Sequence, residues 1–244
     1  MAARKIKDGI YAVGAIDWDR RLFDELIPLP DGTSYNSYLI FGSEKTALID
    51  TADPSKEFEL LSNLKQAGVS KIDYVIANHA EQDHSGSIPK ILEMFPTAKV
   101  VTNAKCKEML KDLLHVPEEK FIVVADHQAL QLGGRTLEFI LAPWVHWPET
   151  MLTWLREDKI LFPCDFLGSH MASSSLYVEN EPAVYRSAKR YYAEIMMPFR
   201  QMIKKHIEVV KALNPEIIAP SHGPVYGKPK FILDAYSDWI SDNV

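Results

Sequence analysis

The segment Asn78–Pro89, NHAEQDHSGSIP, places four potential metal ligands within six residues. They are two imidazoles and two carboxylates, namely His79, Glu81, Asp83 and His84. The segment follows the apolar run IDYVIA, which suits a buried strand, and precedes KILEMF, which has a helical pattern. It is therefore expected to be a loop at the carboxyl end of a strand, where a rigid sheet presents functional groups. Packing two acids and two imidazoles together is unfavourable without a cation, so we expect a metal site.

The composition is that of one globular domain over residues 1–244. Of the 244 residues, 47% are hydrophobic and 25% are charged, which allows a full core. The net charge of −6 provides no basic surface and argues against nucleic acid or an anionic membrane as a partner. No apolar run reaches the roughly 18 residues that a membrane span needs, and the first residues lack the apolar core of a signal peptide. We expect a cytoplasmic protein.

Strands and helices alternate around the ligand segment without a strict βα period, which favours a mixed α/β (α+β) fold. The expected strands are residues 37–41, 46–50, 72–77, 121–124, 136–141, 151–155, 160–163 and 216–219. The expected helices are residues 57–66, 104–114, 183–213 with an interruption at Pro198, and 230–240, with one more near Pro89 capped by Ser87. The apolar residues Phe58, Leu60, Leu61 and Leu64 are expected on one side of the first helix.

Three more candidate ligands follow other predicted strands. They are His146 in APWVHWPET, Asp165 in LFPCDFLG and His222 in APSHGP. A tetrahedral metal site takes about four ligands and an octahedral site about six, so seven candidates suit two metals better than one. Asp165 is the natural bridge. His84 can join its neighbour Asp83 only if the backbone turns sharply after them, which Ser85 and Gly86 would allow.

The remaining titratable residues are expected to stay outside the metal shell. Four histidines without partners in a motif are expected to have no metal role, namely His115, His127, His170 and His206. The two cysteines, Cys106 and Cys164, form no CxxC pair, so neither a disulfide framework nor a thiolate site is indicated. Asp50 in LIDT is expected to steady the site as a buried acid rather than bind the metal.

The motif HAEQDH, followed in order by His146, Asp165 and His222, resembles the metallo-β-lactamase-fold domain of the flavodiiron proteins, which reduce O2 and NO. The resemblance covers essentially the whole chain and includes the segments HWPETM and SHGP. It implies an αββα four-layer sandwich and two iron ions joined by an oxo or hydroxo bridge. The implied ligands are His79, Glu81 and His146 for one iron, Asp83, His84 and His222 for the other, and Asp165 for both.

Glu81 separates this sequence from the zinc hydrolases of the same fold, which carry H-x-H-x-D-H. Here a carboxylate stands in the place of the second histidine. This change adds an anionic hard ligand, which favours ferric over ferrous iron and makes electron donation to a bound gas easier. Zinc, which is redox-inert, would gain nothing. The sequence thus predicts a non-heme diiron protein that binds and reduces O2, or NO.

The resemblance also suggests where electrons come from. Flavodiiron proteins continue into a flavodoxin domain that carries FMN, but this sequence ends at Val244 and shows no glycine-rich phosphate loop. We therefore expect no FMN on this chain and a separate donor, such as flavodoxin or rubredoxin. Stand-alone forms of the domain are oxygen-binding diiron proteins linked to O2 or iron sensing in bacterial chemotaxis, and this sequence is similar to them. The chain is thus expected to act either as an oxygen sensor or as a reductase, and the family implies a homodimer. Candidate residues of the gas pocket are Asp24, Trp147, Tyr191 and Tyr192.

Two other functions remain open at this point. One is a dinuclear zinc hydrolase, in which a metal-bridging hydroxide attacks an ester or a phosphodiester. The other is an interaction module, whose iron site regulates docking to a signalling partner. The sequence identifies neither that partner nor the electron donor.

Overall fold

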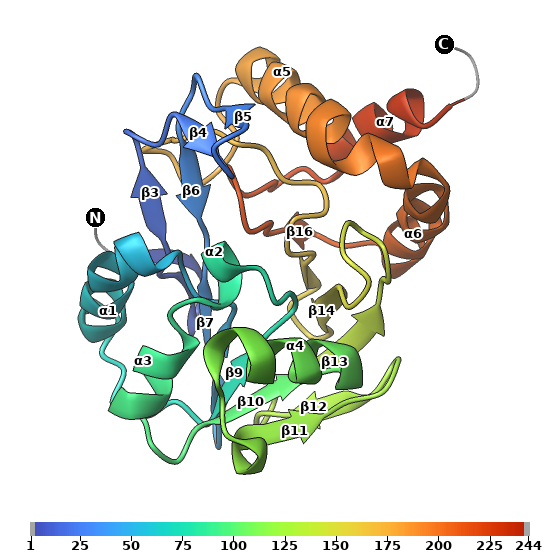
Figure 1. Cartoon of the computed structure of the whole chain (residues 1–244). Coiled ribbons are helices and arrows are strands. Elements are labelled where there is room, and N and C mark those ends of the chain that lie inside the picture. Colours follow the sequence, from blue (N-terminus) through green and yellow to red (C-terminus); the bar gives the residue numbers. More distant parts are fainter. Residues whose placement is uncertain (1–2, 242–244) are drawn as a thin grey trace.

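Two sheets form the centre of the molecule in the computed structural model, which describes residues 3–241 (Figure 1). The first sheet has seven strands in the order β1-β2-β7-β8-β9-β10-β11. They are β1 (Arg4–Lys7), β2 (Ile10–Ala12), β7 (Tyr38–Phe41), β8 (Thr46–Ile49), β9 (Tyr74–Ile76), β10 (Lys99–Thr102) and β11 (Phe121–Val123). Strands β7 and β8, both predicted, pair antiparallel as a hairpin. From β8 to β11 the strands run parallel.

The second sheet has five strands in the order β12-β13-β14-β15-β16. They are β12 (Ala129–Gln131), β13 (Thr136–Leu141), β14 (Met151–Leu155), β15 (Ile160–Phe162) and β16 (Ile217–Ile218). Two short ribbons lie beside the sheets. One pairs β3 (Ala15–Asp17) with β6 (Thr33–Tyr35), and the other pairs β4 (Leu22–Phe23) with β5 (Ile27–Pro28).

Helices cover the outer face of each sheet (Figure 1). Against the first sheet lie α1 (Glu57–Gln66), α3 (Ile88–Met94) and α4 (Ala104–Leu114). Against the second lie α5 (Glu181–Tyr191), α6 (Arg200–Leu213) and α7 (Lys230–Trp239). The short helix α2 (Gln82–Ser85) follows β9, and single turns occupy η1 (Pro54–Lys56), η2 (Glu118–Lys120), η3 (Tyr192–Met196) and η4 (Met197–Phe199).

Successive side chains of each strand point to opposite faces of its sheet, and this alternation produces the layers. In β8, Leu48 packs into the core under α1, α3 and α4, whereas Ile49 packs between the two sheets. In β15, Leu161 packs into the core under α5, α6 and α7, and Phe162 faces the first sheet. Because neighbouring residues of a strand point to opposite faces, both sheets bury both of their faces. The result is the predicted αββα four-layer sandwich.

Several local predictions differ from the structure. Phe58 is 80% exposed, because α1 turns it away from the buried Leu60 and Leu64. The helical segment before α6 is interrupted earlier than predicted, by a π-helical turn from Tyr192 that precedes Pro198. Pro198 has no amide hydrogen for the carbonyl four residues back, so the preceding turn adjusts. Strands β1 to β6, β10 and β12 were not among the predicted strands.

The ligand segment also differs from the predicted loop. Residues Asp83 and His84 lie on α2, a helix of four residues, rather than in irregular chain. Ser87 precedes α3 as predicted, but its side chain makes no capping bond and instead donates to Ala52 O. No helix among residues 3–241 is long and apolar enough to cross a membrane.

Candidate metal centre

Both sheets contribute candidate ligands to one place in the fold. His79 and Glu81 follow β9 of the first sheet, and α2 then adds its pair of ligands. The second sheet provides His146 in the loop between β13 and β14, Asp165 after β15 and His222 after β16. Strand ends fix these side chains, because the backbone before each of them is held in a sheet. All seven predicted candidates are brought together.

Four of them form a first group. The potential ligand atoms of His79, Glu81, His146 and Asp165 all lie within 4.8 Å of one another. Glu81 Oε2 is 3.1 Å from His79 Nε2 and 3.4 Å from His146 Nε2. Asp165 Oδ2 is 3.2 Å from His146 Nε2 and 3.5 Å from His79 Nε2. These atoms surround one point, as the ligands of a metal ion do, and do not form a single isolated ion pair.

The second group consists of Asp83, His84 and His222. The Nε2 atoms of both imidazoles approach the other oxygen of Asp165, Oδ1, at 2.9 Å for His84 and 3.2 Å for His222. His222 Nε2 also lies 3.1 Å from Asp83 Oδ2. Asp165 therefore presents one oxygen to each group.

Unpaired polar atoms show that the residues fit a metal. Both oxygens of Asp83, Oδ1 of Asp165 and both ring nitrogens of His84 have no hydrogen-bond partner among the described residues. All three residues are at most 4% exposed. Buried polar atoms are nearly always hydrogen-bonded, and leaving them unpaired is costly. His84 Nε2 lies near Asp165 Oδ1 without the geometry of a hydrogen bond. A cation bound between these converging atoms would replace the hydrogen bonds that they lack.

The charges of the cluster shift the pKa values of the metal-free chain. Burial lowers the pKa of His146, but its bonds to Asp165 and Glu81 outweigh burial and raise the pKa to about 9. Burial likewise disfavours the charged form of His222, yet Asp165 and Asp83 raise its pKa to about 10. Without metal, these imidazoles hold protons that a cation would displace, so metal binding is coupled to proton release.

Groups behind the ligands hold them in place. His79 Nδ1 lies 2.7 Å from Glu149 Oε1, and His222 Nδ1 donates to the Ser34 carbonyl at 2.6 Å. Asp50 accepts from the amide nitrogen and the side-chain nitrogen of Asn78, at 2.8 and 3.0 Å. Asp50 thereby braces the residue before His79, and that Asp50 does not bind the metal stays a prediction.

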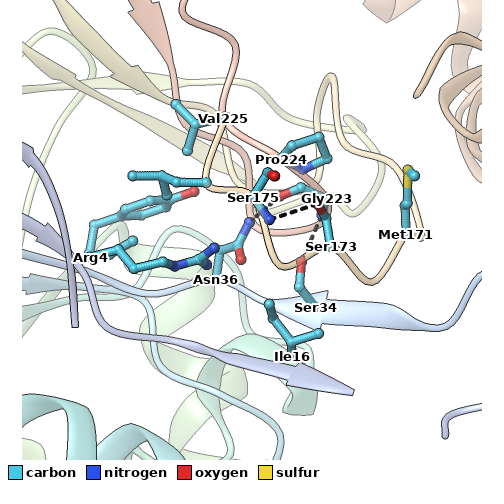
Figure 2. A pocket seen from close by; sticks show the side chains of 13 residues that line it. Arg4, Ile16, Ser34, Asn36, Met171, Ser173, Ser175, Gly223, Pro224 and Val225 are labelled. Atoms are coloured by element: carbon cyan, nitrogen blue, oxygen red, sulfur yellow. Dashed lines mark hydrogen bonds between the residues drawn. The ribbon is translucent and has the colours of Figure 1, made fainter. Parts of the chain in front are cut away.

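The loop that carries His222 is braced from behind (Figure 2). Asn36 Nδ2 donates to the Gly223 carbonyl at 2.7 Å, and the Gly223 amide donates to Ser34 Oγ at 2.8 Å. Gly223 has a φ of +80°, and a Cβ there would lie 2.1 Å from Ser169 Oγ. The adjoining pocket, into which Arg4 points, has a volume of about 10 Å³, close to what one water needs.

The four predicted pocket residues lie at different places. Trp147 sets its ring edge to face against His79, with centroids 4.8 Å apart. Tyr191 is buried with its ring 5.9 Å from that of His222. Asp24 is an exposed residue whose pKa is raised by partial burial and by Glu81 and Asp83. Tyr192 is not brought to the cluster, because its ring packs against those of Tyr236 and Trp239.

Three further residues lie beside the cluster, of which His170 and Cys164 were expected to stay outside the metal shell and Glu149 was not singled out from the sequence. The rings of His170 and His222 are tilted against each other with centroids 4.5 Å apart. His170 Nδ1 lies 2.9 Å from Thr33 Oγ1, and its Nε2 has no partner among the described residues. Cys164 places its sulfur within 4.8 Å of ligand atoms of His84 and Asp165. Glu149 lies under His79. Only their place in the fold marks them, although HWPET does put Glu149 three residues after His146.

The other histidines and Cys106 are remote from the groups. His115 ends α4, His127 pairs with Glu138, and His206 lies buried on α6. None of them, nor Cys106, belongs to a metal-like group among residues 3–241. That they and His170 bind no metal stays a prediction.

Comparison with known proteins identifies a family. A family model described as "ODP family beta lactamase" matches residues 33–223. Coenzyme F420H(2) oxidase of Methanothermobacter marburgensis is 36% identical over 254 residues, covering 100% of this chain and 62% of the relative. Nitric oxide reductase of Moorella thermoacetica is 40% identical over 242 residues, covering 96% and 60%. The structure of rubredoxin oxygen:oxidoreductase from Desulfovibrio gigas superposes with a TM-score of 0.92 at 32% identity, covering 98% and 61%. The chain thus spans about 60% of the length of these relatives.

Proposed function

Because the chain belongs to the ODP family beta lactamases, as a metallo-β-lactamase-like domain of the flavodiiron type, we propose that it holds two iron ions and reduces O2 or NO with electrons from a separate donor. One relative is named an oxidase of coenzyme F420H(2), another a nitric oxide reductase. A third is named for rubredoxin and oxygen. Those names describe proteins that are longer than this chain.

The position of Asp165 carries the proposal. Its Oδ2 faces the imidazole of His146 and its Oδ1 faces those of His84 and His222, so one carboxylate joins two groups of donors. In the proposed centre, Asp165 would be a ligand of both ions. The other ligands would be His79, Glu81 and His146 for one iron, and Asp83, His84 and His222 for the other.

The chemistry of the donors favours iron over zinc. Glu81, Asp83 and Asp165 supply three carboxylates, and hard anionic oxygens stabilise ferric iron. A pair of iron ions held by these residues would supply the electrons for reduction of a diatomic gas. The chain positions this centre, because the ligands other than Glu81 and His146 are nearly buried. Trp147 packs on the ring of His79 and would shield that side from water.

A partly apolar edge beside His146 is where a donor could approach. Trp144 and Met197 are 48% and 52% exposed. Trp144 stacks on Phe199 with ring centroids 6.2 Å apart, and Phe199 lies 6.5 Å from the ring of His146. A donor that covered this edge would come close to a proposed ligand. The homodimer and a role in chemotaxis stay predictions from the resemblance, and the cytoplasmic location stays a prediction from the lack of a signal-peptide pattern and of a membrane-spanning apolar run in the sequence.

Oxygen uptake tests the function. Fully ferrous, iron-loaded protein would be followed with an oxygen electrode and by absorbance, first alone and then with excess reduced flavodoxin or rubredoxin. Sustained consumption with a donor is expected for a reductase. Uptake that stops near one O2 per pair of irons, even with donor present, would instead indicate a binding protein or a sensor. Protein from iron-replete cells that contains two zincs and hydrolyses esters would contradict the proposal.

A further inference from the structure

We propose that Glu149 is a positioning residue for His79 and that its charge makes the metal at His79, Glu81 and His146 the more tightly bound of the two. The inference rests on the proposed two-metal centre. It concerns a residue that binds no metal itself. Glu149 acts on the nitrogen of His79 that faces away from the centre.

The contact between the two residues is short and fully enclosed. Glu149 Oε1 lies 2.7 Å from His79 Nδ1, and both side chains are 0% exposed. The same oxygen accepts from the amide of Ala80 at 3.1 Å. With its proton on Nδ1, His79 turns the unprotonated Nε2 toward Glu81 and Asp165, at 3.1 and 3.5 Å. A carboxylate behind a ligand imidazole fixes its tautomer and raises its basicity.

The second group has no equivalent partner among the described residues. His222 Nδ1 donates to a neutral backbone carbonyl, that of Ser34, at 2.6 Å. His84 Nδ1 has no hydrogen-bond partner. The two groups therefore differ in charge behind their imidazoles, although Asp165 serves both. Glu149 therefore places a negative charge in direct contact with a ligand imidazole of the first group, which strengthens the binding of the ion there.

Glu149 is itself held firmly. Asn103 Nδ2 donates to the Glu149 carbonyl at 2.6 Å, and the Asn103 side chain caps α4. Glu149 belongs to the loop between β13 and β14 that also carries His146. This single loop thus supplies one proposed ligand and orients another, His79, from a different sheet. Glu149 Oε2 is buried without a partner among the described residues, so burial of this carboxylate lowers the stability of the fold.

Stepwise metal titration tests the proposal. Metal-free protein would be titrated anaerobically with Co(II), which reports each site by its visible absorption, and by calorimetry. Wild type is expected to bind two ions in separable steps. Glu149→Gln keeps the shape and removes the charge, and should weaken the tighter step by about 10–100-fold, far more than it weakens the other. Glu157→Gln, which removes a carboxylate that bonds Thr136 away from the centre, is the matched control and should change neither step.

A second measurement applies even if Glu149→Gln fails to fold. Nitrogen-15 spectra of the zinc-loaded wild type should show His79 with its proton on Nδ1 and metal on Nε2. The opposite tautomer would overturn the proposal. So would an equal loss of both affinities together with a lower melting temperature in Glu149→Gln, which is what a purely structural role predicts. A wild type that fails to bind two ions would refute the proposed function itself, before any variant is compared.

Discussion

Asp165 Oδ1 lies 2.9 Å from His84 Nε2, while the other oxygen of the same carboxylate faces the first group of donors. A side chain in this position couples the occupancy of two metal sites. Asp165→Ala should therefore lower the bound iron from two ions per chain to one or fewer. Metal analysis of purified protein checks this, with Asp112→Ala, at an exposed residue of α4, as the control. Two irons retained in Asp165→Ala would contradict the bridging role.

Glu81 is expected to decide which metal the centre holds. Glu81→His recreates the H-x-H-x-D-H pattern of the zinc hydrolases and removes one hard anionic ligand. The ratio of zinc to iron should rise in protein produced in medium containing both metals. The comparison needs wild type prepared in the same batch of medium. An unchanged ratio would show that the carboxylate does not select the metal.

His84 offers a direct test of the second group. It is fully enclosed, and neither ring nitrogen has a hydrogen-bond partner among the described residues. His84→Ala should weaken the second metal step by about tenfold or more, since a ligand is lost. His115→Ala, at the exposed end of α4, is the control. If His84→Ala binds both ions as wild type does, His84 is a buried neighbour and not a ligand.

Gly223 is expected to be essential for the loop of His222. Its φ of +80° strains any L side chain, and a Cβ would also meet Ser169 Oγ at 2.1 Å. Gly223→Ala should lower the free energy of unfolding by about 1–3 kcal/mol from strain, and further from the clash. Gly68→Ala is a matched control, because Gly68 has a φ of +76° with nothing within 4 Å of its Cβ. Thermal unfolding of both variants separates strain from clash, and equal losses would exclude the clash.

The lowered pKa of Asp73 predicts how the free energy of unfolding depends on pH. Burial favours a raised pKa, but hydrogen bonds from Lys71, the amide of Thr46 and Lys45 outweigh it and hold the pKa below its ordinary value of 3.8. The folded chain therefore keeps this carboxylate charged at a pH where the unfolded chain is protonated. Its contribution to stability is present above about pH 3.8 and is lost as pH falls through the lower folded value.

The measurement is denaturant unfolding of Asp73→Asn and wild type from pH 7 to pH 3. The difference in unfolding free energy should be largest near neutral pH and shrink below pH 4. The exposed Asp112→Asn, on α4, controls for general charge effects. A difference that stays constant with pH would contradict the proposed linkage.

The sequence predicted most of what lies in one continuous stretch. The residues from His79 to His84 are neighbours in the chain, and the bounds of α1, α4 and β13 follow from local pattern. The position of Phe58 could not be predicted, because its spacing in the helix does not say which arc the sheet will cover. Strand β12 has only three residues, of which two are exposed, so it shows little apolar alternation.

What the sequence did not show depends on contacts between distant segments. Glu149 meets His79 across 70 positions, and His170 meets Thr33 across 137. Neither residue type nor local spacing distinguishes such a carboxylate or imidazole from an ordinary one. Asp165 was predicted as a candidate because it follows a predicted strand, and its role as the bridge then came from the number of ligands that two metals need.

The arrangement of ligands on both sheets has a mechanical consequence. Four candidates follow β9 of the first sheet, and three follow β13, β15 and β16 of the second. Between the sheets lies mainly an apolar core, which resists separation but has little directional preference. Bound ions would link the two sheets at one end of that core. Without metal, the sheets would be held together mainly by their apolar interface and would be free to change their relative orientation. Metal occupancy would then alter the positions of the outer helices, although none of those helices contacts the metal.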